Sequence, residues 1–210
     1  MMERSAYKLS LALAWLALAS CGGASGSEAG ICTGTFTACG GDPTGQWEVA
    51  STCLGTSFTQ LLDDALAARS AACAGAVQSA SLSASGTVAY SAGTVTYDMT
   101  IRTTSSISYP MACLQALWPN ITADAAGCAS LGPAPGDPEE TGSCSFAGSA
   151  CNCDGASTSP DTSAYSYTVS GATITESGGA SYEFCVSGAA MSQRVALVGT
   201  SYGVMTLTKQ

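Results

Sequence analysis

The chain has 210 residues, of which 46% are hydrophobic and 10% charged, and its formal net charge is −9 at pH 7. This length suffices for one domain with a substantial core. Because there is no histidine and there are only six basic residues, the composition excludes catalytic sites built on histidine and a basic surface for nucleic acid.

The first residues have the layout of a secretory signal. Arg4 and Lys8 precede an apolar run at 9–19, which is shorter than the roughly 20 residues that span a bilayer. The run ends in Leu-Ala-Ser-Cys, which resembles the lipobox of bacterial lipoproteins. That resemblance implies removal of residues 1–20, lipidation of Cys21 and, since residue 22 is glycine, placement in the outer membrane. An ordinary signal peptide with a chance cysteine is the alternative.

The mature chain is expected to begin with a tether and to continue as one domain. Residues 22–31 are rich in glycine, serine and alanine, which predicts a flexible tether over 21–31 and a folded domain over 32–210. Without residues 1–20 there are 14 acidic and 4 basic side chains, giving 4 − 14 = −10. We therefore expect a membrane partner through the anchor and no nucleic-acid partner.

The cysteine count supports both export and lipidation. There are 11 cysteines, an odd number, and lipidation of Cys21 would leave ten to pair in an oxidising compartment. Metal ligation is the alternative, but the C-x-C of 151–153 has no second pair at zinc-site spacing. Closure over the helical stretches favours the pairs Cys53–Cys73 and Cys113–Cys128. The ten candidates for disulfides are Cys32, Cys39, Cys53, Cys73, Cys113, Cys128, Cys144, Cys151, Cys153 and Cys185.

Most of the chain alternates apolar and polar residues with the period of a strand. The clearest examples are 81–90 and 94–104, joined at Ser91-Ala92-Gly93, and the pattern resumes from 164 to the C-terminus. Two stretches have helical spacing instead, at 56–73 and 109–120. The whole predicts a mainly β fold with one or two short helices, an antiparallel meander that closes into a small disulfide-stapled barrel. A β-sandwich is the alternative.

The segment 130–162 is rich in glycine, proline, serine and acidic residues, which predicts a long acidic loop. Carboxylates are the remaining candidates for acid–base chemistry or for calcium ligation. None of them matches a known motif or the spacing of a calcium loop, so we expect no enzyme and no cofactor. These carboxylates are Asp63, Asp64, Asp137, Glu139, Glu140, Asp154 and Asp161.

Gly45 and Trp47 resemble the Gly-x-Trp entry of lipocalins, in which the tryptophan closes one end of the barrel and a late arginine, here Arg194, packs over it. The order of lipobox, "CGGDPTGQWEVASTC", "YPMACLQALW", "GSACNCDG" and "YEFCVSG" is similar to that of Cys-rich outer-membrane lipoproteins of myxobacteria and related deltaproteobacteria. This resemblance covers the mature chain. It implies a lipocalin-like barrel and an outer-membrane location, and the family has no established activity.

Two functions remain open from the sequence. The first is a non-enzymatic cell-envelope lipoprotein that acts as a structural module or binds an envelope protein. The second is a lipocalin-like binder of a small hydrophobic ligand inside the barrel. The residues expected to line such a site are Trp47, Tyr90, Tyr97, Tyr165, Tyr167, Tyr182 and Phe184.

Overall fold

Strands dominate the computed structural model, which describes residues 28–122, 124–133, 139–196 and 202–210. The strands are β1 (Gly30–Ile31), β2 (Gly45–Leu54), β3 (Val77–Ser91), β4 (Thr94–Pro110), β5 (Glu140–Ala147), β6 (Ala150–Asp161), β7 (Ala164–Ser170), β8 (Thr173–Glu176), β9 (Ser181–Ser187), β10 (Ala190–Ala196) and β11 (Tyr202–Lys209). The helices are α2 (Phe58–Arg69), the 3-10 turn η1 (Ala71–Cys73), α3 (Met111–Leu117) and α4 (Ala125–Ala129). The predicted mainly β fold is confirmed, and α4 is an additional helix.

The chain divides into two compact units, whereas the sequence predicts a single domain from Cys32. The first, which we call the ring unit, comprises residues 28–57, 82–101, 159–196 and 202–210 of the described chain. The second, the helix-bearing unit, comprises 58–81, 102–122, 124–133 and 139–158. Strands β3 and β4 contribute to both units, and each unit has its own cluster of buried hydrophobic residues.

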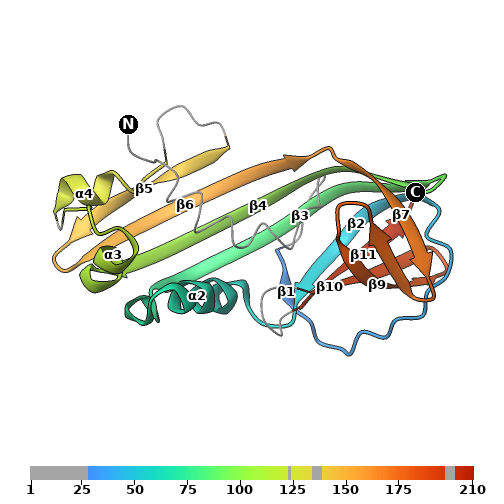
Figure 1. The fold of residues 1–210 in the computed structure, drawn as a ribbon, viewed down its shortest axis with the longest axis horizontal. Coiled ribbons are helices and arrows are strands. Elements are labelled where there is room, and N and C mark those ends of the chain that lie inside the picture. The colour runs from blue at the N-terminus through green and yellow to red at the C-terminus, as the bar shows by residue number, and fades with distance from the viewer. Residues whose placement is uncertain (1–27, 123, 134–138, 197–201) are drawn as a thin grey trace. The chain divides into compact units, whose positions relative to one another are not determined.

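Strand pairing in the ring unit returns to the strand from which it starts (Figure 1). β2 pairs with β11, the order continues through β10, β9, β8 and β7 to β4, and β3 pairs with both β4 and β2. The pairs that run from β2 through β11 and β10 round to β4, and the pair β2–β3, are antiparallel, and short β1 adds to β2 in parallel. The predicted antiparallel meander is therefore present, with ring-like hydrogen bonding.

The strand alternation seen in the sequence corresponds to burial in the ring unit. In β4, Val95, Tyr97 and Met99 are buried, while the residues between them are exposed. The connection from β3 to β4 is the predicted tight turn, in which Ala92 and Gly93 both have positive φ, 49° and 78°. Two successive positive φ values match the twist of a two-residue hairpin.

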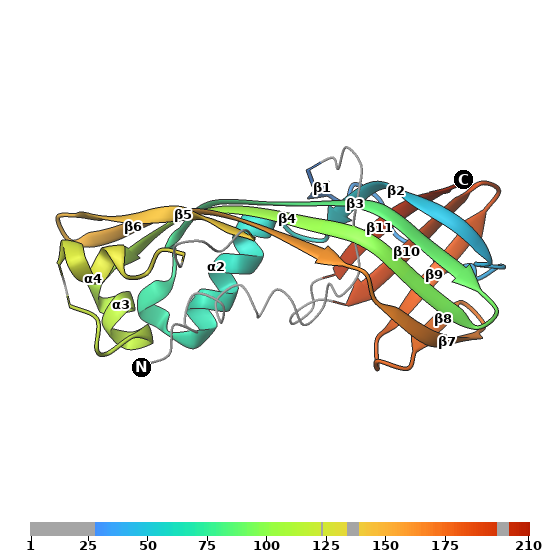
Figure 2. The same ribbon diagram turned by 90° about the horizontal axis from the view of Figure 1, so that it is seen from above.

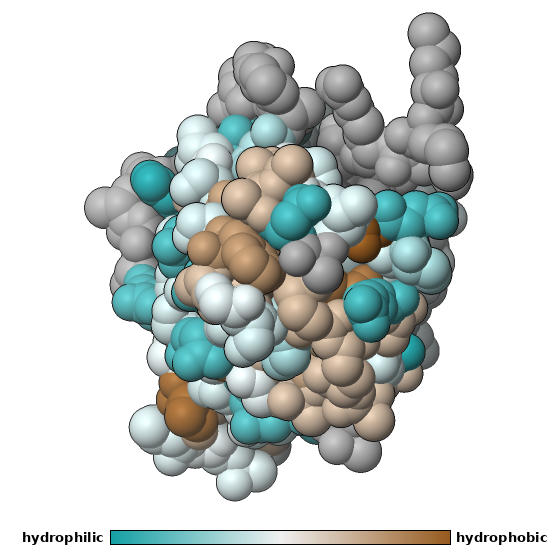
Figure 3. All heavy atoms as spheres, turned by 90° about the vertical axis from the view of Figure 1, so that its left-hand side faces the viewer, coloured by the Kyte–Doolittle hydropathy of each residue, from teal (hydrophilic) through white to brown (hydrophobic). Residues whose placement is uncertain are grey.

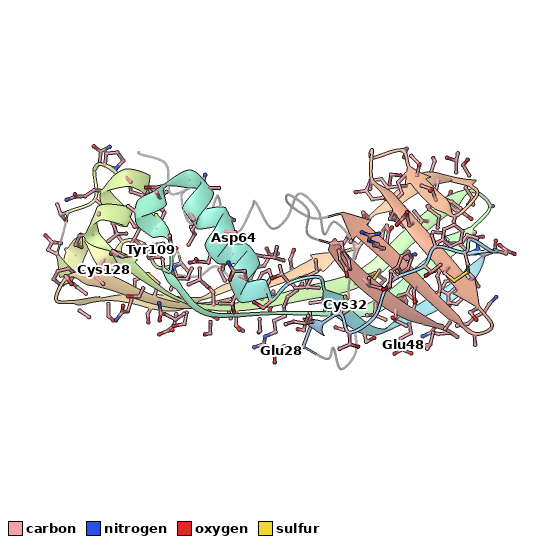
Figure 4. The ribbon with its side chains drawn as sticks, turned by 90° about the horizontal axis from the view of Figure 1, so that it is seen from below. Glu28, Cys32, Glu48, Asp64, Tyr109 and Cys128 are labelled. Carbon is pink, nitrogen blue, oxygen red and sulfur yellow. A yellow bond between two sulfur atoms is a disulfide. The ribbon has the colours of Figure 1, made fainter. Side chains whose placement is uncertain are left out.

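Helices α2, α3 and α4 cover one face of the sheet in the helix-bearing unit (Figure 2). The predicted amphipathic helix is α2, which buries Leu62 and Leu66 in a cluster with Tyr109, Cys128 and their neighbours (Figure 4). The carboxylate of Asp63 accepts hydrogen bonds from the backbone N–H groups of Gly75 at 2.9 Å and of Val77 at 3.1 Å. These bonds hold the middle of α2 against the segment that leads into β3 and the first residue of that strand.

The end of the helix-bearing unit that carries α3, α4 and the β5–β6 hairpin is shown in Figure 3. Apolar side chains gather there between polar ones. Ala112 and Ala116 of α3 and Ala125, Ala126 and Ala129 of α4 are exposed, so small apolar residues form much of the helical surface of this unit. Helix α4 begins at its cap residue Asp124, whose side chain accepts a hydrogen bond from the backbone of Gly127 at 2.8 Å.

The predicted long loop over 130–162 is wrong for most of its length. It contains strands β5 and β6, which pair in register from Glu140 opposite Ser157 to Ala147 opposite Ala150. Gly142 permits this pairing, because its φ is +149° and a Cβ there would lie 2.3 Å from the carbonyl oxygen of Asp154. The acidic and small residues of this segment therefore belong largely to a β-hairpin.

All ten predicted disulfide cysteines are paired, so the expectation of disulfides is confirmed. The suggested pairs Cys53–Cys73 and Cys113–Cys128 are wrong, because Cys53 joins the preceding segment and Cys113 joins the turn after α2. Two bridges lie in the ring unit and three in the helix-bearing unit. They are Cys32–Cys53, Cys39–Cys185, Cys73–Cys113, Cys128–Cys151 and Cys144–Cys153.

The folded part starts earlier than the predicted boundary at Cys32. Glu28 forms a β-bridge with Ser83, and the backbone of Ala29 donates to the carbonyl of Leu82 at 2.7 Å. Gly30 and Ile31 then pair with β2. Residues 28–31 of the predicted tether are thus held in the sheet.

Candidate functional site

The interior of the ring unit contains an aromatic and aliphatic cluster with two buried polar side chains in it. Glu176 is 5% exposed and Gln193 is 3% exposed. An acidic side chain this deeply buried requires partners, because removing a carboxylate from water is costly unless hydrogen bonds replace the lost solvation. The fully buried members around them include Trp47, Tyr90, Tyr97, Phe184 and Met191.

Five strands place the polar cluster, each through its inward-facing positions. Glu176 follows Ile174 at a spacing of two in β8, and Gln193 follows Met191 in the same way in β10. Residues two apart in a strand lie on one face, so both polar side chains point inward with their apolar neighbours. Tyr90, Tyr97 and Tyr182 enter from β3, β4 and β9.

These side chains form one connected hydrogen-bond network that ends on a carboxyl oxygen. Oε1 of Glu176 accepts from the hydroxyl of Tyr182 at 2.8 Å and also from the hydroxyl of Tyr97. The hydroxyls of Tyr182 and Tyr90 are 2.7 Å apart, and Nε2 of Gln193 donates to the Tyr90 hydroxyl at 2.7 Å. We call these five residues the Glu176 network.

The direction of each hydrogen bond follows from counting protons. A phenol has a single proton, and Tyr182 uses its proton on Glu176, so Tyr182 must accept from Tyr90. Tyr90 in turn accepts from the amide of Gln193, which has protons to give. All donors therefore point toward Glu176. Among the described residues, no lysine or arginine forms a salt bridge with it.

Burial disfavours ionisation of the three tyrosines. Desolvation is the largest cause that raises the pKa of Tyr90, Tyr97 and Tyr182 well above the ordinary value, and the nearby carboxyl of Glu176 raises the pKa of each further. At neutral pH the phenols are thus fixed as donors. The network has the character of a structural polar core, with its hydroxyl protons committed to partners inside the cluster.

The residues predicted to line a ligand site do come together in this cluster. Trp47, Tyr90, Tyr97, Tyr182 and Phe184 are buried in it, while Tyr165 and Tyr167 are partly buried and pack against it. The two outer tyrosines contact inner ones edge to face, with ring centroids 5.1 Å apart for Tyr90–Tyr167 and 6.3 Å apart for Tyr97–Tyr165. The aromatic side chains therefore pack largely on one another.

The partner predicted for Trp47 is wrong. Trp47 is fully buried and donates from its indole nitrogen to the carbonyl of Pro43 at 2.7 Å, but the cation over its ring is Lys209, at 5.3 Å from the centroid. The strand register explains why Lys209 takes the place predicted for Arg194, since Lys209 of β11 lies directly opposite Trp47 of β2. Arg194 instead lies over the ring of Tyr202 at 4.6 Å and pairs with Glu183 at 3.2 Å.

The acidic residues considered for metal binding are not grouped into a metal site in the described part of the chain. No group of three or more cysteine or acidic side chains there is arranged to hold a metal ion. Asp161 accepts two hydrogen bonds from Ser163, and Asp64 accepts one from Gln60 on the next turn of α2. Asp154 is exposed on β6, and Asp137 and the predicted lipidation site Cys21 lie outside the described residues.

Sequence reasoning missed Glu176 and Gln193. The signal was present as strand alternation, because Glu176 shares its face with Ile174 and Gln193 shares its face with Met191.

Comparison with known proteins gives no further assignment: no family model, no curated protein and no solved structure matches this chain. In the described residues, none of the helices combines the length and the apolar character that crossing a bilayer requires.

Proposed function

We propose that this chain is an exported lipoprotein, anchored in the outer membrane through lipid on Cys21, that serves the cell envelope as a structural or partner-binding module and not as an enzyme. In this proposal the ring of strands is a small lipocalin-like barrel. The observation that carries the non-enzymatic, non-ligand role is the packing of buried side chains inside the ring unit. Its aromatic side chains pack on one another, and the hydroxyls of the Glu176 network are bonded within the network.

The disulfides support the exported location. Five bridges join ten cysteines in a chain whose remaining cysteine, Cys21, ends the lipobox-like run. Disulfides persist in oxidising compartments such as the bacterial periplasm and cell surface, and cytosolic reductants remove them. The pairing therefore fits a protein that crosses the inner membrane before it folds.

Replacement of the predicted lipidation site tests the anchor. We expect the Cys21→Ser variant to move from the membrane fraction to the soluble fraction, because the acyl chains, which supply about 0.8 kcal/mol per buried CH₂, are the anchor in this proposal. Fractionation of cells that express the wild type and the variant measures this. The Cys32→Ser variant, which loses a cysteine but keeps Cys21, is the control and should stay in the membrane fraction. Continued membrane attachment of the Cys21→Ser variant would contradict the anchor.

Binding of a small hydrophobic ligand inside the ring is the second candidate. It is favoured by the grouping of all seven predicted lining residues in or against one cluster. If the interior is filled by its own side chains, native mass spectrometry of the Cys21→Ser protein from an oxidising compartment should show the loss of two hydrogen masses per bridge for five bridges and no adduct. A retained lipid-sized adduct would favour the ligand-binding function instead.

A further inference from the structure

We infer that the part of the ring unit around Ile31 faces the bilayer and that the Ile31 side chain enters its interface. The inference rests on the proposed lipid anchor, and it begins with the length of the tether. The described fold starts at Glu28, close to Cys32 (Figure 4), so only seven peptide steps, 28 − 21, separate it from Cys21. Seven residues span at most about 25 Å when fully extended.

A tether of this length restricts which side of the protein reaches the membrane. About 25 Å is less than the roughly 30 Å diameter of a small domain. Acyl chains on Cys21 fix that residue at the headgroups, so the surface that carries Glu28 must remain near them. Surfaces on the opposite side of the ring unit cannot reach the bilayer while the anchor is inserted.

The surface at that position is suited to contact with lipid. Ile31 is 59% exposed and Val169 is 42% exposed, and these are the large hydrophobic residues that the described chain exposes most. No charged residue occurs between Glu28 and Asp42, and Thr33, Thr35 and Thr37 in this stretch are exposed. Because residues 29–41 are uncharged, Ile31 enters the membrane interface without desolvating a charge of that stretch.

The backbone holds Ile31 rigidly in this exposed position. Ile31 pairs with Leu54 of β2, and the next residue, Cys32, donates from its backbone to the carbonyl of Leu54 at 2.9 Å and is bridged to Cys53. Ile31 therefore cannot turn inward to hide its side chain. A fixed apolar residue close to the end of a short lipid tether is what an interfacial contact requires.

Quenching of an added tryptophan by brominated lipid tests the inference. Lipid-modified mature Ile31→Trp and Val169→Trp proteins are reconstituted in phosphatidylcholine vesicles, with and without bromine near the headgroup end of the acyl chains. Because Val169 lies on β7 of the same unit and is also exposed, it is the matched control. We expect the fluorescence added by Ile31→Trp to be largely lost in brominated vesicles and that added by Val169→Trp to be unchanged.

Two checks accompany the quenching experiment. Mass spectrometry confirms that both variants keep five disulfides, and flotation with the vesicles confirms that they are anchored. Equal quenching of the two variants, whether large or absent, would overturn the orientation while leaving the anchor intact. Failure of the wild type to float would overturn the proposed anchor and this inference with it.

Discussion

Replacement of Glu176 by leucine should destabilise the ring unit by about 1–6 kcal/mol, because it removes the acceptor of the buried hydroxyls of Tyr97 and Tyr182 and each unsatisfied buried donor costs about 1–3 kcal/mol. The lower bound applies if one hydroxyl then donates to the other, since their oxygens are 3.3 Å apart. A whole domain is stable by only about 5–15 kcal/mol, so this loss is a large fraction of the total. Urea unfolding of the chain from residue 21 onward in a Trp118→Phe background measures it, since Trp47 is then the remaining tryptophan and reports on the ring unit.

Controls separate the lost acceptor from the lost charge and volume. Glu183→Leu on β9 removes a carboxylate that forms an exposed ion pair with Arg194, and it should cost at most about 1 kcal/mol. Glu176→Gln keeps a carbonyl acceptor and should cost less than Glu176→Leu. Adding Tyr97→Phe to Glu176→Leu removes one orphaned donor and should recover part of the stability. Wild-type stability of Glu176→Leu would show that the network does not hold the ring together.

Strand alternation allowed most of the ring unit to be predicted from the sequence. The strand that contains Val95, Tyr97 and Met99 and the turn at Ala92-Gly93 were both visible as local patterns. Local patterns suffice there because most inward positions are apolar and the turn needs residues that tolerate positive φ. The amphipathic helix α2 was predictable for the same reason, through Leu62 and Leu66.

The β5–β6 hairpin could not be predicted from its composition. Glycine, serine and acidic residues have low strand propensity, and in this hairpin tertiary features replace that propensity. The bridge Cys144–Cys153 joins directly opposite positions of β5 and β6, and Cys128–Cys151 joins β6 to α4. Disulfides of this kind decide whether a segment of low strand propensity pairs, and the sequence alone does not show which cysteines they join.

Cysteine pairing and the cation over Trp47 depend on contacts between distant parts of the chain. Cys39 and Cys185 are 146 residues apart and meet only because Gly40 bridges to β9. Lys209 replaces Arg194 over Trp47 because β11 closes the ring against β2. The number of bridges followed from counting cysteines, but which sulfurs meet is set by strand order.

Glu176 shows the limit of choosing site residues by type. Aromatic residues of the predicted strands are the expected lining, and five of the seven are buried together. The carboxyl that organises their hydroxyls was passed over, because acidic residues are rarely fully buried. Inward alternation with Ile174 was the stronger signal, since a strand cannot turn one residue outward without disturbing the face on which its neighbours lie.

The ring unit should lose stability steeply above about pH 10. Burial raises the pKa of Tyr90, Tyr97 and Tyr182 in the folded protein, whereas an exposed tyrosine in the unfolded chain has a pKa of about 10. Above that pH the unfolded state releases protons that the folded state retains, so the free energy of unfolding falls as pH rises. The contribution of these phenols is complete below pH 10 and is lost progressively above it.

The slope has an expected size. One retained proton lowers the free energy of unfolding by about 1.4 kcal/mol per pH unit, so three tyrosines give about 4 kcal/mol per pH unit. Urea unfolding between pH 9 and the alkaline transition, in the Trp118→Phe background, measures it. Absorbance of tyrosinate should show these three phenols ionising only as the protein unfolds. Disulfide exchange is suppressed during the measurement in the Cys21→Ser form, because all ten of its cysteines are bridged.

Single replacements assign the slope to the network. Each of Tyr90→Phe, Tyr97→Phe and Tyr182→Phe should reduce the slope by about 1.4 kcal/mol per pH unit, because one proton fewer distinguishes the folded from the unfolded state. Their effects at neutral pH are separate, since they report lost hydrogen bonds and not titration. Wild-type slope in all three variants would mean that these hydroxyls ionise in the folded protein, which would contradict a closed and dry polar core. A slope reduced in all three would tie the alkaline limit of the ring to the same hydroxyls that hold Glu176 at neutral pH.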